Sequence, residues 1–442
     1  MRFTSSGIAA AVDGTVVGPD VTVNGVSIDS RSLTAGQLFV PLVAERDGHD
    51  FIAGAIQRGV EVWFSSTVAG TDQAVQAGLT AIEVADTMAA LTALGSYARQ
   101  RLSGEVIGIT GSVGKTSTKD LMRAVLAAGL GATHANVTSF NNEIGVPLTL
   151  AQSSVEDKAV IVEMGSRGVG HIADLCAIAA PTIGVVTTVG AAHTSEFGNV
   201  ETVAKAKGEL VAAVGSTGTV VLNADNPWTV AMTKRTSARC VMFGLTEGAE
   251  VTATDISMDA QLRPRFTLVT PSGSAPVGLE ARGAHNVMNA LAAAAVGHAL
   301  GLSAPAIAHG LGSAVLSPWR MEVLAGRSGS TIINDAYNAN AISTEAALRS
   351  LAAVPATRQV AVLGVMAELG DLHDADHQRM ATLAAELGIE VIAFQEAAYG
   401  LAVVGSLDEA EARIGTLNAD TAVLVKGSRV AGLESLAQRL LA

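Results

Sequence analysis

The residues with the most distinctive chemistry lie between Val106 and Thr118, where the chain reads Val-Ile-Gly-Ile-Thr-Gly-Ser-Val-Gly-Lys-Thr-Ser-Thr. A β-branched apolar run stops at a glycine-rich turn, and a helix-compatible segment, Lys119–Leu130, follows. The backbone N–H groups of such a turn converge at the positive end of the helix, where a phosphate binds well. The segment therefore predicts a phosphate-binding turn made of Gly111, Ser112, Val113, Gly114, Lys115, Thr116 and Ser117.

Two side chains of this turn have expected roles. Lys115 would reach the β- and γ-phosphates of a nucleotide, and the Thr116 hydroxyl would bind the accompanying magnesium ion. The standard P-loop begins with a glycine five residues before Gly114, where this chain has Ile109. The motif is thus a shortened form, and its flanking strand and helix favour nucleotide binding over an ordinary turn.

Polar residues also follow two other predicted strands, at the edge of a parallel sheet where ligands bind. Glu163 comes directly after the run Ala159–Val162, and His193 follows the run Ile183–Thr187 through a short turn. A carboxylate at that edge is a hard oxygen ligand for a metal ion on the phosphates. Because it accompanies the phosphate-binding turn and Glu163, we interpret His193 as part of the same site.

Two nearby segments allow more than one interpretation. The predicted helix Glu201–Val214 carries Lys205, Lys207 and Glu209, and a solvated helix face is the simplest interpretation for Lys205. The segment Asn223–Pro227 ends another predicted strand, and a helix cap explains it as well as a ribose contact does.

Two other classes of nucleotide-binding protein fit less well. Gly168-x-Gly170-x-x-Ala173 resembles a dinucleotide fingerprint, but the next strand ends in Thr188-Val189-Gly190, without an acidic residue for a ribose hydroxyl. A regulatory GTPase would need Asn-Lys-x-Asp to read guanine, and the sequence contains none. A dehydrogenase and a nucleotide switch are therefore disfavoured.

Alternating strand-like and helical segments must position these residues. The alternation predicts an α/β fold with mostly parallel sheets covered on both faces. An irregular antiparallel region is expected at Glu250–Val277, and a smaller α/β unit precedes the phosphate-binding turn. The strands expected from Val106 onward are Val106–Thr110, Ala159–Val162, Ile183–Thr187, Thr219–Leu222, Ile332–Ile333, Val360–Leu363, Val391–Phe394 and Val423–Val425. The earlier unit is expected to contain strands at Val21–Val26, Leu38–Val43, Val60–Phe64 and Thr80–Val84 and helices near Ile52–Arg58 and Thr87–Leu102.

Size and composition set the remaining bounds. A chain of 442 residues exceeds the size at which single cores stop growing, and we expect domains at 1–103, 104–316 and 317–442. The net charge of −13 argues against nonspecific nucleic-acid or membrane binding. Two cysteines give no disulfide framework, which fits a cytoplasmic protein. Residues 283–319 carry no charged side chain, but Ser303-Ala304-Pro305 interrupts them, so we predict two buried helices and no membrane insertion.

Several motifs, in their order and spacing, resemble the Mur ligase family, whose members add amino acids to a UDP-muramoyl precursor of peptidoglycan. They cover nearly the whole chain. The motifs are Ile28-Asp29-Ser30-Arg31, Gly48-His49-Asp50-Phe51, Thr110-Gly111-x-x-Gly114-Lys115-Thr116-Ser117, Ser139–Thr149, Glu163-Met164-Gly165, Ala204–Glu209, His285-Asn286-x-x-Asn289-Ala290, Asp335–Asn340 and Lys426-Gly427-Ser428-Arg429.

The resemblance implies a three-domain architecture. A small N-terminal α/β domain would bind the UDP precursor, a central P-loop domain with a mostly parallel sheet would bind ATP, and a C-terminal Rossmann-like α/β domain would bind the incoming dipeptide and close over ATP. It also implies that the protein is a cytoplasmic enzyme, which we expect to be a monomer.

The resemblance further implies roles for individual residues. Lys115, Lys207, His193 and Glu163 would be catalytic. Thr116, Glu163 and His193 would bind Mg²⁺, and Lys207 matches the lysine that family members carbamylate to hold a second Mg²⁺. Beyond the turn itself, the residues expected to bind ATP are Asn286, Asn289, Arg320 and Asp335. Those expected to bind the precursor or the dipeptide are Asp29, Ser30, Arg31, His49, Thr138, Ser139, Asn141, Asn142, Tyr337, Asn338, Asn340, Lys426, Ser428 and Arg429.

The implied activity is the ATP-dependent joining of D-alanyl-D-alanine to UDP-N-acetylmuramoyl-tripeptide through an acyl phosphate. The sibling that adds diaminopimelate carries Asp-Asn-Pro-Arg in its last domain, whereas the comparable strand here is followed by Gln395-Glu396-Ala397. The chain also departs from the family pattern at Ala341, where proline is usual. The alternatives are a family ligase that adds another amino acid and a nucleotide-binding homologue without catalysis.

Overall fold

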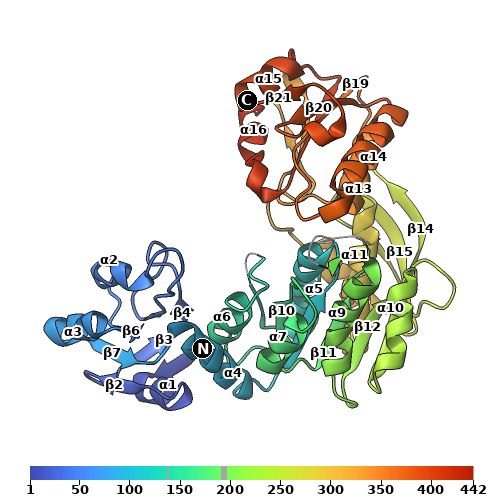
Figure 1. Ribbon diagram of the computed structural model, residues 1–442. Coiled ribbons are helices and arrows are strands. Elements are labelled where there is room, and N and C mark those ends of the chain that lie inside the picture. The colour runs from blue at the N-terminus through green and yellow to red at the C-terminus, as the bar shows by residue number, and fades with distance from the viewer. Residues whose placement is uncertain (137–138, 191–196, 442) are drawn as a thin grey trace. The chain divides into compact units, whose positions relative to one another are not determined.

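Short β-branched runs and alanine-rich helical segments alternate along the chain, and the computed structural model folds them into the strands and helices of an α/β protein (Figure 1). It describes residues 1–136, 139–190 and 197–441. Two contact units divide the chain. One comprises Met1–Gly108, Leu130–Gly165 and Ile172–Ile183, and the other comprises Ile109–Gly129, Ser166–His171 and the chain from Gly184 onward. The predicted boundaries near residues 103 and 316 remain a prediction.

The N-terminal part of the first unit contains a five-stranded sheet in the order β2-β7-β6-β5-β4 and an antiparallel pair, β1 and β3. Its core packs Phe39, Ile52, Trp63 and Ala81 together. All the predicted segments here contain helix or strand, but β1, α1, β2 and α3 were not predicted. The elements are β1 Arg2–Thr4, α1 Ser5–Ala11, β2 Thr15–Val17, β3 Thr22–Asn24, β4 Val26–Ser27, β5 Leu38–Phe39, η1 Gly48–Phe51, α2 Ile52–Gln57, β6 Val62–Ser65, α3 Val68–Ala77, β7 Thr80–Glu83 and α4 Thr87–Gln100.

A six-stranded sheet follows, in the order β13-β12-β11-β8-β10-β9. The pairs β9 with β10 and β12 with β13 are parallel, as the alternating pattern predicts. Two expectations need correction, since the helix after the glycine-rich turn begins at Lys115 and Glu163 is the last residue of its strand. The elements are β8 Glu105–Thr110, α5 Lys115–Leu130, β9 Thr133–Ala135, α6 Gly145–Gln152, β10 Ala159–Glu163, α7 His171–Ala179, β11 Ile183–Val186, α9 Val200–Ala213, β12 Thr219–Asn223, α10 Pro227–Ala231, η2 Met232–Arg235 and β13 Arg239–Phe243.

The next stretch confirms two predictions. The irregular region forms an antiparallel sheet of β14 (Thr252–Met258), β15 (Pro264–Thr270) and β16 (Gly273–Gly278). The uncharged stretch forms two helices, α11 (His285–Ala299) and α12 (Ala304–Gly312). Among the described residues, none of the helices has the length and apolar character needed to span a bilayer.

The C-terminal sheet has the order β17-β18-β22-β19-β20-β21, and it is parallel except at β17. Alternate residues of its strands face opposite ways, so Ile333 and Leu424 pack with α13 and α14 while Ile332 and Val423 pack with α15 and α16 (Figure 1). The elements are β17 Glu322–Ala325, η3 Arg327–Gly329, β18 Thr331–Asp335, α13 Ala341–Ala352, β19 Arg358–Leu363, η4 Gly370–Leu372, α14 His373–Glu386, β20 Glu390–Phe394, η5 Ala397–Tyr399, β21 Val403–Val404, α15 Leu407–Ile414, β22 Thr421–Lys426, η6 Arg429–Ala431 and α16 Glu434–Arg439.

Candidate active site

The glycine-rich turn between β8 and α5 leaves no room for side chains at its two glycines. A Cβ added at Gly111, where φ is +151°, would lie 1.9 Å from the Thr187 hydroxyl oxygen. One added at Gly114, where φ is +84°, would lie 2.4 Å from Asn289 Oδ1. Thr187, which sequence reasoning missed, also donates a 2.6 Å hydrogen bond to the Val113 carbonyl. Its place at the end of a predicted strand was the available signal.

The start of α5 carries Lys115 and Thr116, and the Arg320 side chain contacts Thr116 there. Lys115 Nζ donates a 2.7 Å hydrogen bond to the Gly111 carbonyl, so the lysine folds back over its own turn. Arg320 Nη2 donates to Thr116 Oγ1 at 2.8 Å. The guanidinium carbon of Arg320 also lies 4.2 Å from the centre of the Tyr337 ring, a cation–π contact. The structure thus brings Arg320 into contact with both Thr116 and Tyr337, next to Lys115 in the turn.

Asn286 and Asn289, on the first turns of α11, are buried beside the same turn. Asn289 Nδ2 donates to Asn286 Oδ1 at 2.8 Å, and Asn289 Oδ1 accepts from the Thr118 hydroxyl at 3.3 Å. These bonds tie the first turns of α11 to α5. The expected contact of both asparagines with adenine remains a prediction.

Lys207 lies on the buried face of α9, whereas Lys205 is exposed, as the solvated interpretation of Lys205 predicts. Val203 and Val211, four residues to either side of Lys207, pack in the core that α9 forms with β11 and β12. Lys207 is 2% exposed. Burial, and secondarily the positive charge of Lys115, hold the pKa of the Lys207 amine well below its ordinary value.

Glu163 is buried at the end of β10, where Asn141 Nδ2 donates to its Oε1 at 2.9 Å. The Asn141 carbonyl accepts from the Gly165 amide at 2.7 Å. Asn142 has a local role, because its Oδ1 accepts from the Gly145 amide at 3.0 Å at the start of α6. Ser139 is half-buried.

Two predicted site residues, Thr138 and His193, lie outside the described residues. Their roles therefore remain predictions.

The substrate-binding residues expected in the first predicted domain are placed in two clusters. Arg31 holds both carboxylate oxygens of Asp29, each at 2.9 Å, beside Ser30. Hydrogen bonds from Arg31 lower the pKa of Asp29. His49 is buried, its Nδ1 lies 2.6 Å from Asp47 Oδ1, and its Nε2 accepts from the Ser66 amide at 3.1 Å. Both ring nitrogens of His49 thus have partners within the fold.

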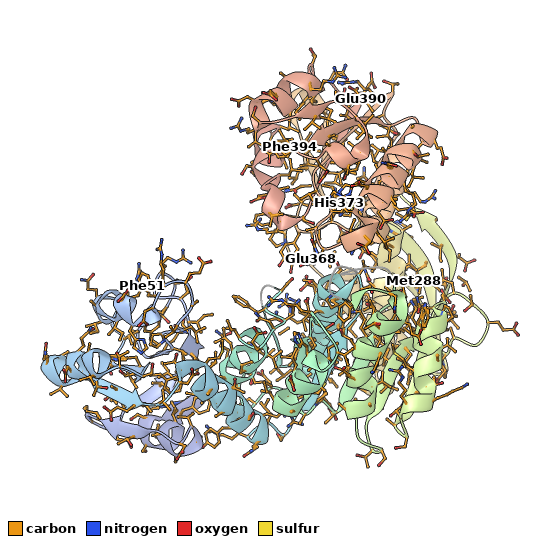
Figure 2. The ribbon with its side chains drawn as sticks, in the orientation of Figure 1. Phe51, Met288, Glu368, His373, Glu390 and Phe394 are labelled. Carbon is orange, nitrogen blue, oxygen red and sulfur yellow. The ribbon has the colours of Figure 1, made fainter. Side chains whose placement is uncertain are left out.

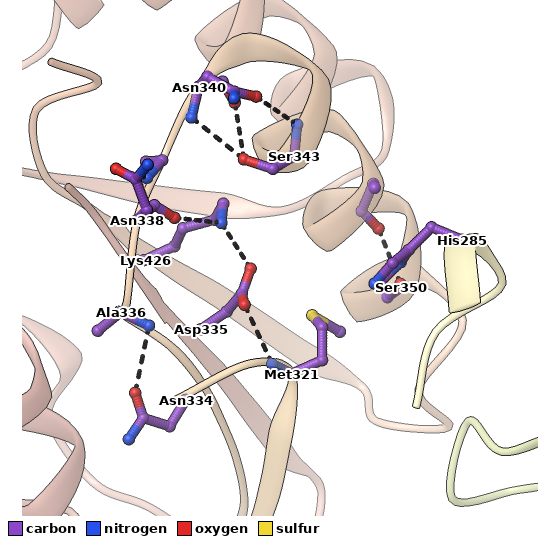
Figure 3. A network of polar contacts seen from close by, with 12 residues as sticks. His285, Met321, Asn334, Asp335, Ala336, Asn338, Asn340, Ser343, Ser350 and Lys426 are labelled. Atoms are coloured by element: carbon purple, nitrogen blue, oxygen red, sulfur yellow. Dashed lines mark hydrogen bonds and ion pairs between the residues drawn. The ribbon is translucent and has the colours of Figure 1, made fainter. Parts of the chain in front are cut away.

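A third group lies at the carboxyl ends of adjacent parallel strands of the C-terminal sheet (Figure 3). Asp335 of β18 and Leu363 of β19 are both in register with Lys426 of β22. Lys426 Nζ donates to Asp335 Oδ2 at 2.5 Å and to the Asn338 carbonyl at 2.9 Å. Asp335 Oδ1 accepts from the Met321 amide at 3.0 Å, next to Arg320 in the chain. The end of this sheet is therefore linked to the segment that contacts Thr116.

The neighbouring loop residues have defined local partners. Asn340 forms a capping box with Ser343 at the start of α13 (Figure 3). This cap stabilises the first turn of the helix, which begins at Ala341, the position where proline is usual. The Ser428 hydroxyl donates to the Ala339 carbonyl at 3.2 Å. Arg429 is exposed and stacks over the Trp319 ring at 4.3 Å.

The segment after β12 supports the helix-cap interpretation. Asn226 Oδ1 accepts from the Thr229 amide at the start of α10, and Pro227 occupies the first turn of that helix. Asn226 Nδ2 also donates to the Val189 carbonyl at 2.8 Å. Asn226 therefore caps α10.

Family models, named relatives and solved structures all relate this chain to the Mur ligases. Residues 22–99 match the model for the Mur ligase family, catalytic domain, residues 109–297 match the Mur ligase middle domain, and residues 319–429 match the Mur ligase, glutamate ligase domain. The UDP-N-acetylmuramoyl-tripeptide–D-alanyl-D-alanine ligase of Mycobacterium bovis is 39% identical over 94% of this chain and 92% of its own length. That of Escherichia coli is 34% identical over 100% of this chain and 98% of its own. A crystal structure of MurF from Acinetobacter baumannii superposes with a TM-score of 0.86 at 29% identity, covering 100% of this chain and 99% of that one.

Proposed function

The chain belongs to the Mur ligase family, and we propose that it joins D-alanyl-D-alanine to UDP-N-acetylmuramoyl-tripeptide with the hydrolysis of ATP to ADP and phosphate. The observation that carries the proposal is the glycine-rich turn, with Lys115, Thr116 and Arg320 at the start of α5, in a chain similar over its whole length to ligases named for this reaction. The same similarity favours this activity over a family ligase for another amino acid.

The first chemical step activates an unreactive carboxylate. A carboxylate oxygen of the tripeptide attacks the γ-phosphorus of ATP, the bond to the bridging oxygen breaks, and ADP leaves, which gives an acyl phosphate. Such a transfer depends on positioning and charge neutralisation more than on covalent help from the protein. Lys115 and Arg320 supply fixed positive charges next to the turn, and the turn's amides offer donors to the phosphate oxygens.

The second step forms the amide. The amine of D-alanyl-D-alanine attacks the acyl carbon, a tetrahedral intermediate forms, and inorganic phosphate leaves as the nitrogen loses its proton. Because acyl phosphates hydrolyse, the site must exclude water, and we assign this task to closure of the C-terminal domain over ATP. Arg320 and Asp335 would be drawn to the nucleotide in that closed state.

Magnesium would neutralise charge on the transferring phosphoryl group. Thr116 would offer its hydroxyl oxygen, which keeps a second lone pair beside the one that accepts from the Arg320 guanidinium. The buried carboxylate of Glu163 provides a hard oxygen ligand. We assign Mg²⁺ binding to Thr116, Glu163 and His193, with Lys207 as a further ligand once it is carbamylated.

Carbamylation of Lys207 joins the neutral amine to CO₂ and releases one proton. Burial favours the neutral amine that this reaction needs, and the positive charge of Lys115 would stabilise the anionic product. If the carbamate is required, Lys207→Ala should be inactive and partly rescued by small carboxylic acids. Full activity of this variant without rescue would remove the carbamate from the mechanism.

The substrates are assigned to the three predicted domains. Residues 1–103 would bind the UDP precursor, with the UDP group at Asp29, Ser30 and Arg31 and with His49 as a further substrate-binding residue. Thr138, Ser139, Asn141 and Asn142 would face the muramoyl-peptide. Residues 317–442 would bind the dipeptide through the loops that carry Tyr337, Asn338, Asn340, Lys426, Ser428 and Arg429. We place the reaction in the cytoplasm and expect a monomer.

Phosphate release tests the function directly. With ATP and UDP-muramoyl-tripeptide present, adding D-alanyl-D-alanine should start phosphate release, whereas glutamate, diaminopimelate or lysine should not. Lys115→Ala should abolish the release, since losing one charge-stabilising group typically costs about a hundredfold or more. Normal turnover by this variant would refute the role of the turn, and release that responds to another amine would replace the proposed acceptor.

A further inference from the structure

The turn that follows β19, residues 364–369, forms three hydrogen bonds with residues 426–428, the loop that begins at Lys426. The Gly364 amide donates to the Lys426 carbonyl at 2.9 Å, and the Ser428 amide donates to the Val365 carbonyl at 2.8 Å. The Ala367 amide donates to the Ser428 hydroxyl oxygen at 2.9 Å. These three bonds link the turn to residues 426–428, and Lys426 in turn contacts Asp335 and the Asn338 carbonyl.

Two buried side chains also form hydrogen bonds with the backbone of this turn. His377 Nε2 accepts a 2.9 Å hydrogen bond from the Met366 amide, and the Tyr399 hydroxyl donates a 2.9 Å hydrogen bond to the Gly364 carbonyl. The two rings also contact each other edge to face, with centres 4.8 Å apart. His377 therefore binds an N–H group of the turn, and Tyr399 binds one of its carbonyl groups.

The tautomer of His377 is set by its second nitrogen. Nδ1 lies 2.6 Å from the carbonyl of His373, one helical turn earlier in α14, so Nδ1 carries the proton and Nε2 offers a lone pair. Figure 2 labels His373 at the start of α14 and Glu368 in the turn. The arrangement requires a neutral imidazole, and its one ring lone pair, on Nε2, accepts the hydrogen bond from the Met366 amide.

His373, His377 and Glu396 also come close enough together to suggest a metal site, because their ligand atoms lie within 4.8 Å of one another. A metal ion there would need the Nε2 lone pair of His377, which accepts from Met366. Binding would leave the buried Met366 amide without its partner, which is unfavourable. The geometry favours the hydrogen bond over the metal.

We propose that His377 is a positioning residue for the incoming dipeptide. By holding the Met366 amide, it keeps the turn after β19 in the shape that supports Lys426 and Ser428, and thus the loop that faces D-alanyl-D-alanine. This inference rests on the proposed function. His377 itself would contact no substrate, and its effect would pass through the hydrogen bonds of the turn with His377 and with residues 426–428.

Steady-state kinetics of three variants test the proposal. His377→Leu removes the acceptor, and the KM for D-alanyl-D-alanine should rise about tenfold, the equivalent of one lost hydrogen bond. His377→Gln keeps an acceptor oxygen near the Nε2 position and should restore the KM to within about threefold of wild type. The affinity of both variants for a nonhydrolysable ATP analogue should stay within about twofold of wild type, because the phosphate-binding turn is untouched. His309→Leu, at an exposed position of α12, is the matched control.

The outcomes separate the alternatives. A lowered melting temperature with unchanged KM in His377→Leu would reduce His377 to a structural residue and overturn the proposal. Stoichiometric Zn²⁺ binding that His377→Gln abolishes would also overturn it, in favour of a metal site. If His377→Leu does not fold, Tyr399→Phe, which removes the bond to Gly364, should raise the same KM, and an unchanged value there would contradict the inference. Wild-type protein without dipeptide-dependent phosphate release would instead contradict the proposed function.

Discussion

Lys207 shows how one side chain can oppose stability and serve chemistry. It is buried on the face of α9 that carries core residues, and the lowered pKa of its amine reflects the cost of keeping a charge there. A lysine in such a place needs a reason other than packing. Carbamylation would provide such a reason, because the positive charge of Lys115 would stabilise an anionic carbamate on Lys207, whereas it disfavours the protonated amine.

Lys207→Met should therefore separate stability from activity. Methionine fills a similar volume without an amine, so thermal unfolding should occur at the same or a higher temperature than in wild type. Phosphate release should fall by about a hundredfold or more if the residue stabilises the transferring group. Differential scanning calorimetry and the phosphate assay measure the two effects on one protein sample. A clear drop in melting temperature together with retained activity would reverse this view of Lys207.

Single residues differ in how far the sequence can place them. Lys207 could be recognised as buried, because it lies four residues from both Val203 and Val211 on an apolar stripe, while Lys205 lies off that stripe. The resemblance placed Arg320 and Thr116 at the same nucleotide site, but spacing alone could not predict their direct hydrogen bond, because it joins residues 204 apart in sequence. Hydrogen bonds of that kind depend on how elements pack, which spacing along the chain does not encode.

At the scale of elements, the phosphate-binding turn is built by a close approach of strands. Thr187 directly follows β11, and its hydroxyl lies where a side chain on residue 111 would have to go. The turn's shape is therefore set by two segments far apart in the chain, and the glycine at 111 is required both for its backbone angle and for space.

Gly111→Ala should weaken nucleotide binding without unfolding the protein. The new methyl group would meet Thr187 Oγ1 at 1.9 Å, so the turn must shift, and we expect at least a tenfold loss of affinity for a nonhydrolysable ATP analogue by isothermal titration calorimetry. Gly131→Ala is the matched control, because φ there is +97° and no atom lies within 4 Å of the added Cβ. Both variants carry backbone strain of about 1 kcal/mol, and equal affinities in the two would contradict the packing argument.

Element prediction succeeded where periodicity runs long enough to be read. The helices α11 and α12 and eight strands of the two six-stranded sheets are found where the pattern places them, namely β8, β10, β11, β12, β18, β19, β20 and β22. The other strands of these sheets, β9, β13, β17 and β21, were not predicted. The three-residue strands β1 and β2 were missed because so few residues cannot establish alternation. The start of α5 was placed four residues late because glycine and lysine in the turn hid the first helical residues.

At the scale of the whole molecule, buried histidines couple stability to pH. Burial lowers the pKa of His134, His285 and His377, whereas hydrogen bonding to Asp374 raises that of His373. The ordinary pKa of histidine is 6.5. When the pH falls below this value, these three histidines are protonated in the unfolded chain but stay neutral in the folded protein until the pH reaches their lowered pKa. Stability should therefore fall as the pH drops below 6.5, with His373 offsetting part of the effect.

Urea unfolding at constant ionic strength checks this. The midpoint should be lower at pH 5.5 than at pH 7.5, and the difference should shrink in His377→Gln because one of the three rings is gone. A midpoint that stays constant or rises on acidification would show that His373 and other groups outweigh the buried histidines.

The proposed separation of the nucleotide and the UDP group can also be tested on the intact chain. A ligand that binds only the folded protein adds about 2.7 kcal/mol of stability at a hundredfold excess over its Kd. Each kcal/mol raises the melting temperature by about 2–4 °C in a domain of roughly 150–250 residues.

A nonhydrolysable ATP analogue and the UDP-muramoyl-tripeptide should each raise the melting temperature of wild-type protein. Lys115→Ala should abolish the shift caused by the analogue and keep that caused by the precursor. Arg31→Ala should do the reverse, since Arg31 is exposed beside Asp29 and its removal leaves the phosphate-binding turn intact. If Arg31→Ala responded to the precursor as wild type does, the assignment of the UDP group to residues 29–31 would fail while the nucleotide assignment stood.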